Sequence, residues 1–255
     1  YYYAEQCGPT QPDATQGDLV PVIACDFSTG AADPERVWIV GDSHAQQWQG
    51  AAFELARERG WVVTLAYRGH CPAADVAYVG FRGLASPDEV SACREWSRSV
   101  STAVLEAKPD LVLTAMAARQ HLVDDGSGRS GADQFVEGLL ADWNTWADAG
   151  IRVAPVADPP LNGEVRGPDC VVLNPSDPLT CARPRADAQP ADPVVTAARL
   201  ADREEIRLVD LTDFFCDAQM CYSVVGGVPV YYDADHLNLV YVRMLAPAFG
   251  AALDR

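Results

Sequence analysis

The chain has 255 residues, 49% of them hydrophobic and 22% charged, and its formal net charge is −17 at pH 7. This length suits one α/β domain or at most two small ones, with enough apolar side chains for a sizeable core. The negative surface would repel nucleic-acid phosphates and anionic lipid headgroups, which argues against both as partners. No apolar run approaches the length that spans a bilayer.

Residues 1–36 contain proline, glycine, threonine and two cysteines, and their apolar residues show little periodicity. We therefore expect an irregular segment that a disulfide holds to the rest of the protein. The apolar run 36–40 is then typical of a buried strand, and the amphipathic stretch 44–60 is typical of a helix that ends at Gly60. Residues 61–67 form the next apolar run. These patterns predict a strand, a helix and a second strand.

The middle of the chain continues this alternation. Residues 86–108 predict a helix with a capping box, in which Ser86 is the N-cap, Pro87 takes the first position and Glu89 follows three residues after the cap. Three further elements are expected here: a strand over 109–117, a helix over 131–150 and a strand over 151–158.

Residues 158–193 are rich in Pro, Asp and Asn and are interpreted as a long surface excursion. After it we expect a short helix near 194–205, a strand over 206–211 and a closing helix over 236–253. Alternating strands and helices indicate a single domain over 37–255. Its expected fold is a three-layer α/β/α sandwich around a mostly parallel, doubly wound, flavodoxin-like sheet of about five strands.

The eight cysteines indicate disulfides. They contain no Cys-x-x-Cys pair and no histidine cluster accompanies them, so a zinc site is disfavoured. Pairing in chain order would close four local loops, although other pairings remain open: Cys7–Cys25, Cys71–Cys93, Cys170–Cys181 and Cys216–Cys221. The alternative is a reduced cytosolic protein with buried thiols. Because disulfides persist outside the cytosol, the even number and close spacing favour an extracytoplasmic protein.

A serine stands where the first apolar strand ends and the next helix begins, in Gly41-Asp42-Ser43-His44. One interpretation is structural, with Gly41 allowing the turn and Asp42 or Ser43 capping the helix. The other is chemical, since unpaired N–H groups at a helix start favour an oxyanion beside the serine. In an open α/β sheet this serine lies at the carboxyl edge of the strands, where sites form.

A serine needs a general base, and the chain has four histidines. His44 is adjacent to Ser43, so its side chain diverges from it on a helix. His70 and His121 follow the second and third strands, but no carboxylate stands at a spacing that would orient them. His236 has Asp233 three residues before it, which on a helical turn would share its face. Asp235 is the competing carboxylate, and a capping Asp233 beside a surface histidine is the structural alternative.

These two motifs, Gly41-Asp42-Ser43 near one end and Asp233-Ala234-Asp235-His236 near the other, resemble those of the SGNH (GDSL-type) hydrolase superfamily. The resemblance covers residues 37–250. The histidine after the serine, the Cys-Pro after the second strand and the Cys-x4-Cys shortly before Asp233 look most like the SGNH domain of bacterial acyltransferase-3 proteins. In that family a membrane acyltransferase domain precedes the SGNH domain, so residues 1–36 are expected to link to an upstream region.

The resemblance implies that Ser43 is the nucleophile, His236 the general base and acid, and Asp233 its orienter. It implies oxyanion donors at the backbone N–H of Ser43 and at Gly69, which matches the second-block glycine. The Gly-x-Asn that typically follows the third strand is missing. Two other side chains in that loop are candidate donors, with an ordinary loop role as the alternative: Arg119 and Gln120.

The function implied is that of an O-acyltransferase, most simply an O-acetyltransferase, which forms an acyl-serine intermediate and delivers the group to a cell-envelope glycan or glycolipid. A membrane domain of the same polypeptide would supply the acyl group, on the outer face of the bacterial cytoplasmic membrane. No metal or cofactor is implied. The alternatives are a secreted carbohydrate esterase with the same triad and a catalytically silent glycan-binding module. Four aromatic residues are candidates for stacking on sugars, with core packing as the alternative: Trp48, Tyr67, Tyr231 and Tyr232.

Overall fold

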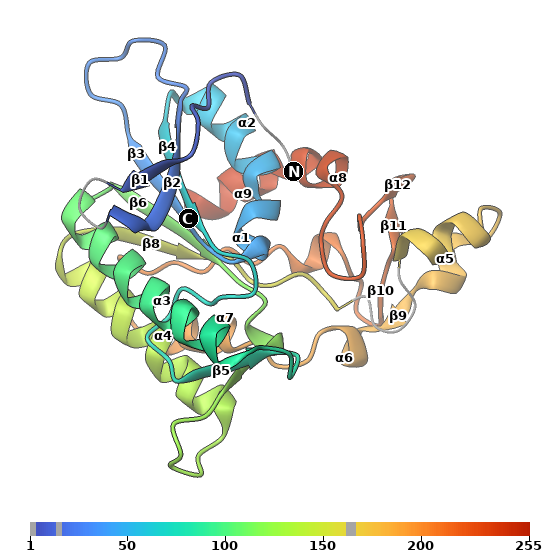
Figure 1. The fold of residues 1–255 in the computed structure, drawn as a ribbon. Coiled ribbons are helices and arrows are strands. Elements are labelled where there is room, and N and C mark those ends of the chain that lie inside the picture. The colour runs from blue at the N-terminus through green and yellow to red at the C-terminus, as the bar shows by residue number, and fades with distance from the viewer. Residues whose placement is uncertain (1–3, 14–16, 162–166) are drawn as a thin grey trace.

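The computed structural model describes residues 4–13, 17–161 and 167–255 (Figure 1). Within these ranges the central sheet has six strands in the order β1-β2-β4-β3-β6-β8. Their bounds are Gln11–Asp13 for β1, Gly17–Asp26 for β2, Arg36–Gly41 for β3, Val62–Tyr67 for β4, Leu111–Ala115 for β6 and Arg152–Pro155 for β8. Strands β4, β3, β6 and β8 are parallel, whereas β2 and β1 are antiparallel to their neighbours. The mostly parallel sheet expected from the sequence is confirmed.

Both faces of this sheet are buried, as β3 shows. Val37 and Ile39 belong to one hydrophobic cluster, and Trp38 and Val40 belong to the other. Successive side chains of a strand point to opposite faces, so a strand covered on both sides is a continuous apolar run. Figure 1 shows the sheet between two helical layers, which confirms the α/β/α sandwich.

The two layers are built from helices of different parts of the chain. One layer consists of α2 (Gln49–Arg59), α8 (Leu239–Met244) and α9 (Ala246–Leu253). The other consists of α3 (Pro87–Ala107), α4 (Gly131–Asp148) and α7 (Pro193–Leu200). The capping box predicted for α3 is confirmed, because Ser86 Oγ accepts from the N–H of Glu89 and the Glu89 carboxylate accepts from the N–H of Ser86.

The N-terminal segment differs from the irregular one predicted for residues 1–36. Strand β2 adds an antiparallel strand next to β4, with Cys25 opposite Val63. Val20 and Ile23 lie in opposite core clusters, but the end of the strand is buried on one face only, with Ile23 and Cys25 buried and Ala24 and Asp26 exposed. This alternation covers only four residues, and Pro21 interrupts the apolar run before it, which is why the sequence pattern did not predict a strand here.

Three further boundaries also differ. The helix expected over 44–60 is divided at Trp48 into α1 (Ser43–Gln47) and α2, because the Trp48 N–H bonds to the carbonyl of Ala45, three residues back. The closing helix begins at Leu239 rather than at residue 236, since the Asn238 side chain caps it by accepting from the N–H of Val240. The strand expected over 206–211 is reduced to two isolated parallel bridges, Val153–Ile206 and Val156–Val209, at the edge beside the short β8.

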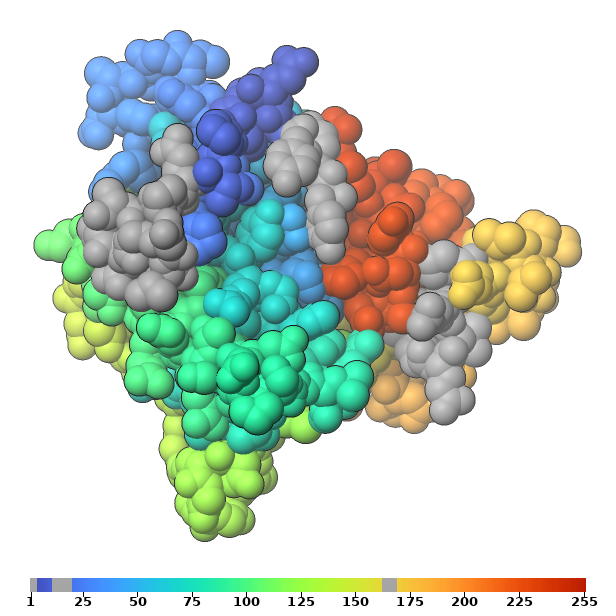
Figure 2. Space-filling view, in the orientation of Figure 1, coloured from blue at the N-terminus to red at the C-terminus, as the bar shows by residue number. Residues whose placement is uncertain are grey.

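Of the excursion predicted at 158–193, the part around α5 (Gly167–Leu173) projects from the body (Figure 2), whereas residues 158–160 are buried. The described part of the excursion also carries a 3-10 turn, the two-residue strand β9 (Arg183–Pro184) and α6 (Arg185–Ala188), and residues 162–166 lie outside the described ranges. The structure contains four disulfides, in the chain-order pairing: Cys7–Cys25, Cys71–Cys93, Cys170–Cys181 and Cys216–Cys221. Among the described helices, none has the length and apolar character needed to cross a bilayer.

Candidate active site

Ser43 lies at the carboxyl edge of the sheet because β3 ends at Gly41 and α1 begins at Ser43, two residues later. The φ angle of Gly41 is +153°, and a Cβ at this position would lie 1.9 Å from the carbonyl oxygen of Ala115. Only glycine therefore fits beside β6. Asp42 then caps α1, with its carboxylate accepting from the N–H of His44 at 2.7 Å. Both the turn and the cap proposed from the sequence are present, and they leave the Ser43 side chain in the first turn.

His236 and Asp233 lie beside this serine. The Oγ of Ser43 is 2.8 Å from Nε2 of His236, and Nδ1 of His236 is 2.8 Å from Oδ2 of Asp233. Partial burial alone would raise the pKa of the Asp233 carboxyl, but hydrogen bonds from two backbone N–H groups and from His236 outweigh it and lower that pKa. Asp233 is therefore ionised at neutral pH and can hold a proton on Nδ1, which leaves Nε2 as an acceptor toward Ser43.

The helical turn predicted to join Asp233 to His236 is wrong. The two residues lie in a tight loop before α8, closed by the N–H of Tyr232 donating to the carbonyl of His236 at 2.8 Å. The Oδ1 of Asp233 accepts from the N–H of His236 at 2.7 Å, so backbone and imidazole share one carboxylate. The N–H of Leu237 donates to Oε1 of Gln47 at 2.9 Å, which attaches the loop to α1. This attachment sets the distance between His236 and Ser43.

Asp235, the competing carboxylate, turns away from His236 and forms an ion pair with Arg82. Arg82 also lies over the ring of Phe81, with 5.0 Å between the guanidinium carbon and the ring centroid. The ring of His70 stacks on that of Phe81 as well, with 4.6 Å between the two ring centroids. Among the described residues, no hydrogen bond joins His70 to Ser43. The role of the neighbouring Gly69 as an oxyanion donor stays a prediction.

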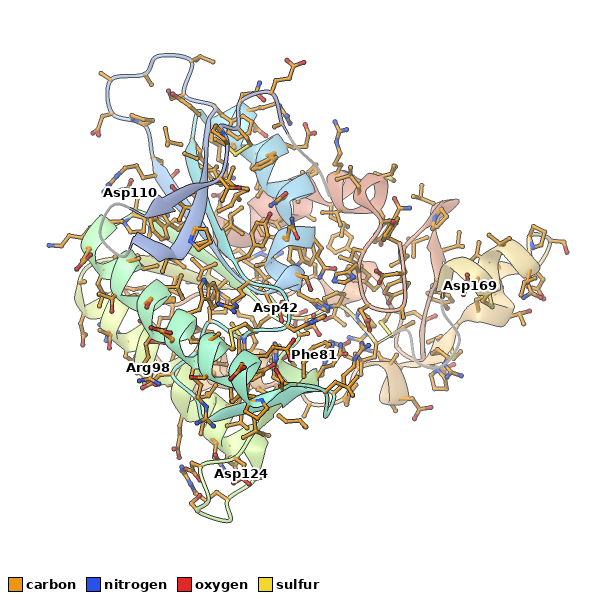
Figure 3. All side chains as sticks on the ribbon, viewed as in Figure 1. Asp42, Phe81, Arg98, Asp110, Asp124 and Asp169 are labelled. Atoms are coloured by element: carbon orange, nitrogen blue, oxygen red, sulfur yellow. A yellow bond between two sulfur atoms is a disulfide. The ribbon has the colours of Figure 1, made fainter. Side chains whose placement is uncertain are left out.

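His121 also bonds to a residue other than Ser43. Its Nε2 is 2.7 Å from Oδ2 of Asp42, and both side chains are fully buried. The same Oδ2 accepts from the N–H of Ala117 at 3.0 Å, which ties the loop after β6 to the serine turn. Burial raises the pKa of Asp42, but the bonds and charges of His121 and His44 together with the Ala117 N–H lower it overall. Figure 3 labels Asp42 and Phe81 close together near the middle of the view, and the His121 ring contacts both.

Arg119 already donates to other groups, so its side chain is not available as an oxyanion donor. Its Nη2 lies 3.0 Å from Oδ2 of Asp158 and 2.5 Å from the carbonyl oxygen of Pro159, and its side chain is buried. The other loop candidate, Gln120, accepts from Arg82 through Oε1. Asp158 also bonds to His44, so its carboxylate contacts both Arg119 and His44. Sequence reasoning missed Asp158, although it closes the fourth apolar run at the same carboxyl edge as Ser43.

A pocket of about 310 Å³ opens beside Ser43 and His236. Its other lining residues come from α1, α2, the loop before α8 and the first residue of α8: Gln46, Gln47, Gln49, Gly50, Tyr232, Asp233, Leu237 and Leu239. Of the four aromatic candidates, Trp48 and Tyr231 are buried in the core, and Tyr67 bonds through its hydroxyl to Gln46. Tyr232 is 74% exposed and lines the pocket. It is the one of the four whose ring is available for stacking on a sugar.

Comparisons with known proteins identify the family and the fold. A family model described as the SGNH domain fused to AT3 domains matches residues 7–251. Among solved structures, the periplasmic domain of the lipopolysaccharide acetyltransferase of Salmonella ser. Paratyphi A superposes with a TM-score of 0.61 and 14% identity, over 88% of this chain and 85% of that one. A putative acylhydrolase from Bacteroides fragilis NCTC 9343 gives a TM-score of 0.47 and 14% identity, over 89% and 93%. No curated protein matches the chain in sequence.

Proposed function

Because the chain belongs to the family of SGNH domains that are fused to AT3 domains, we propose that it is the extracytoplasmic domain of a membrane O-acyltransferase. It transfers an acyl group, most simply acetyl, to a hydroxyl of a cell-envelope glycan or glycolipid. The observation that carries this proposal is the chain of two 2.8 Å contacts from Ser43 through His236 to Asp233. The similar fold of a lipopolysaccharide acetyltransferase domain supports it, and the four disulfides support the compartment.

The reaction has two halves. In the first, Ser43 Oγ adds to the carbonyl carbon of the acyl donor while its proton passes to Nε2 of His236. Asp233, bonded to Nδ1, stabilises the imidazolium that forms. When the intermediate collapses, the bond to the leaving oxygen breaks and that oxygen takes the proton from His236, which leaves acyl-Ser43. In the second half, the acceptor hydroxyl loses its proton to His236 and adds to the acyl carbon. The bond from that carbon to Ser43 Oγ then breaks, and Oγ takes the proton back from His236.

The second half also separates transferase from esterase. Water instead of a sugar hydroxyl would give hydrolysis with the same three residues, so a carbohydrate esterase is the second candidate. Family membership favours transfer, because the AT3 domain of the same polypeptide is then the source of the acyl group. A silent glycan-binding module would have no need for a serine, a histidine and an ionised carboxylate in hydrogen-bond contact.

The experiment that tests the proposal is intact mass spectrometry after incubation with p-nitrophenyl acetate. We expect a gain of one acetyl group on the wild-type protein, located on Ser43 by peptide mapping and absent from Ser43→Ala. Adding candidate glycans should shorten the lifetime of the adduct and yield acetylated glycan if transfer is the function. Faster loss to water than to every glycan would favour the esterase. Equal labelling of Ser43→Ala would contradict both.

A further inference from the structure

His44, the residue after the serine on α1, lies against the proposed base His236. The ring centroids of His44 and His236 are 5.3 Å apart, with the rings edge-on at 61°. The His44 side chain is 4% exposed, whereas that of His236 is 22% exposed. A buried imidazole therefore packs directly against the ring of the proposed base, although His44 is not one of the residues that line the 310 Å³ pocket.

The two nitrogens of the His44 ring have different surroundings. Nδ1 lies 2.5 Å from Oδ1 of Asp158. Nε2 has no hydrogen-bond partner among the described residues, and it is not one of their fully buried polar atoms that lack a partner. The small exposed part of this ring therefore includes Nε2.

The charge of His44 decides what Nε2 offers. Burial lowers its pKa, but the negative charges of Asp158, Asp42 and Asp235 outweigh burial and raise the pKa to about 9. At neutral pH both ring nitrogens therefore carry a proton. Nδ1–H donates to Asp158, and Nε2–H is a cationic donor that has no acceptor within the part of the chain that the structure describes.

The surroundings hold this cation rigidly. Asp158 is fully buried and also bonds Nη2 of Arg119 at 3.0 Å. The N–H of Asp158 donates to Oδ2 of Asp192 at 2.9 Å. Asp192 is buried too, and its burial raises its pKa to about 6. The groups that face His44 are thus Asp42 on its own turn, Asp158 with Arg119 and Asp192 behind it, and Asp235 and His236 from the loop before α8.

We propose that Nε2–H of His44 donates a hydrogen bond to the oxyanion, in the role that the missing asparagine of the loop after β6 would have. This inference rests on the proposed acyl-transfer function. As Ser43 Oγ bonds to the carbonyl carbon, the carbonyl π electrons move onto oxygen, and that oxygen accepts from His44. The donor keeps its proton throughout, and the π bond re-forms when the leaving group departs. A fixed cationic donor stabilises the charge that develops in the transition state.

The test compares His44→Phe, His44→Gln and the wild-type protein in Ser43-dependent hydrolysis of p-nitrophenyl acetate. Loss of one oxyanion donor lowers kcat by roughly 10²- to 10³-fold, and we expect this for His44→Phe with little change in KM. His44→Gln retains a neutral N–H donor and should fall between the two. Affinity for an aryl trifluoromethyl ketone, which forms an oxyanion on Ser43, should fall in parallel with kcat. His70→Phe is the matched control and should retain activity.

The pH profile separates this role from a structural one. A group whose pKa is raised to about 9 is charged below that pH and loses its proton as the pH rises through it. Wild-type kcat should therefore fall above about pH 9, and His44→Gln should lack this fall. A folded His44→Phe with kcat within threefold of wild type, or an alkaline fall that persists in His44→Gln, would overturn the inference alone. Absence of both Ser43-dependent turnover and a ketone adduct in wild type would overturn the proposed function as well.

Discussion

Ser43 Oγ and His236 Nε2 lie 2.8 Å apart although 193 residues separate them in the chain. Two local structures produce this contact. The turn at Gly41, pressed against the backbone of Ala115, presents the serine at the edge of the sheet. The bond from the Leu237 N–H to Gln47 then holds the histidine loop on the same short helix as the serine. The distance between the two side chains therefore depends on backbone contacts at both ends.

If Ser43 and His236 act as a unit, their losses should not add. We expect Ser43→Ala and His236→Ala each to abolish hydrolysis of p-nitrophenyl acetate, and the double variant to be no worse than either single variant. The measurement is kcat/KM for each variant, with the uncatalysed rate subtracted. Substantial turnover in His236→Ala would mean that another group takes the proton from Ser43.

Asp233 and Asp235 form a matched pair of carboxylates with different partners. Asp233→Asn should lower kcat strongly, but less than His236→Ala, because the imidazole stays while its tautomer is no longer enforced. Asp235→Asn should be mild, since it breaks a partly exposed ion pair with Arg82, an interaction usually worth about 0–1 kcal/mol. Steady-state kinetics of the two folded variants decide the matter. The reverse ranking would make Asp235 the orienting carboxylate.

Gly41 and Gly69 provide a second matched pair. In Gly41→Ala the new Cβ would overlap the Ala115 carbonyl oxygen at 1.9 Å, so we expect a loss of at least about 2 kcal/mol in the free energy of unfolding and loss of activity. A Cβ on Gly69 meets no atom within 4 Å, and alanine keeps the backbone N–H. Gly69→Ala should therefore keep both stability and activity, as measured by urea unfolding and turnover. An unchanged Gly41→Ala would contradict the turn described here.

Asp142 on α4 predicts a pH dependence of stability. Its burial raises its pKa to about 6, and its Oδ2 atom has no hydrogen-bond partner among the described residues. A carboxyl whose folded pKa exceeds its unfolded value stabilises the folded protein while protonated, and this stabilisation is lost as the pH rises through 6. Asp142→Asn should therefore raise the free energy of unfolding at pH 7.5 by roughly 1–3 kcal/mol, and by little at pH 4. Denaturant unfolding at both pH values measures the difference, and an equal gain at pH 4 and pH 7.5 would contradict the shift.

The sequence alone determined those features whose signals lie within a few residues. The Gly41 turn and Asp42 cap, the capping box at Ser86 and the continuous apolar runs of the parallel strands all follow from local rules of turns, caps and burial. The two motifs at opposite ends of the chain identified the family, because their residue types and order are distinctive.

Only the tertiary structure decided how the edge of the sheet is assembled. The bond between His44 and Asp158 joins residues 114 positions apart, and it exists because the strand order brings the ends of β3, β6 and β8 to one edge. The same packing directs Arg119 into Asp158, and it replaces the expected helical turn at His236 with a loop fastened to Gln47. Strand order and loop docking arise from contacts distant in sequence, so no local pattern around His44, Arg119 or His236 encodes them.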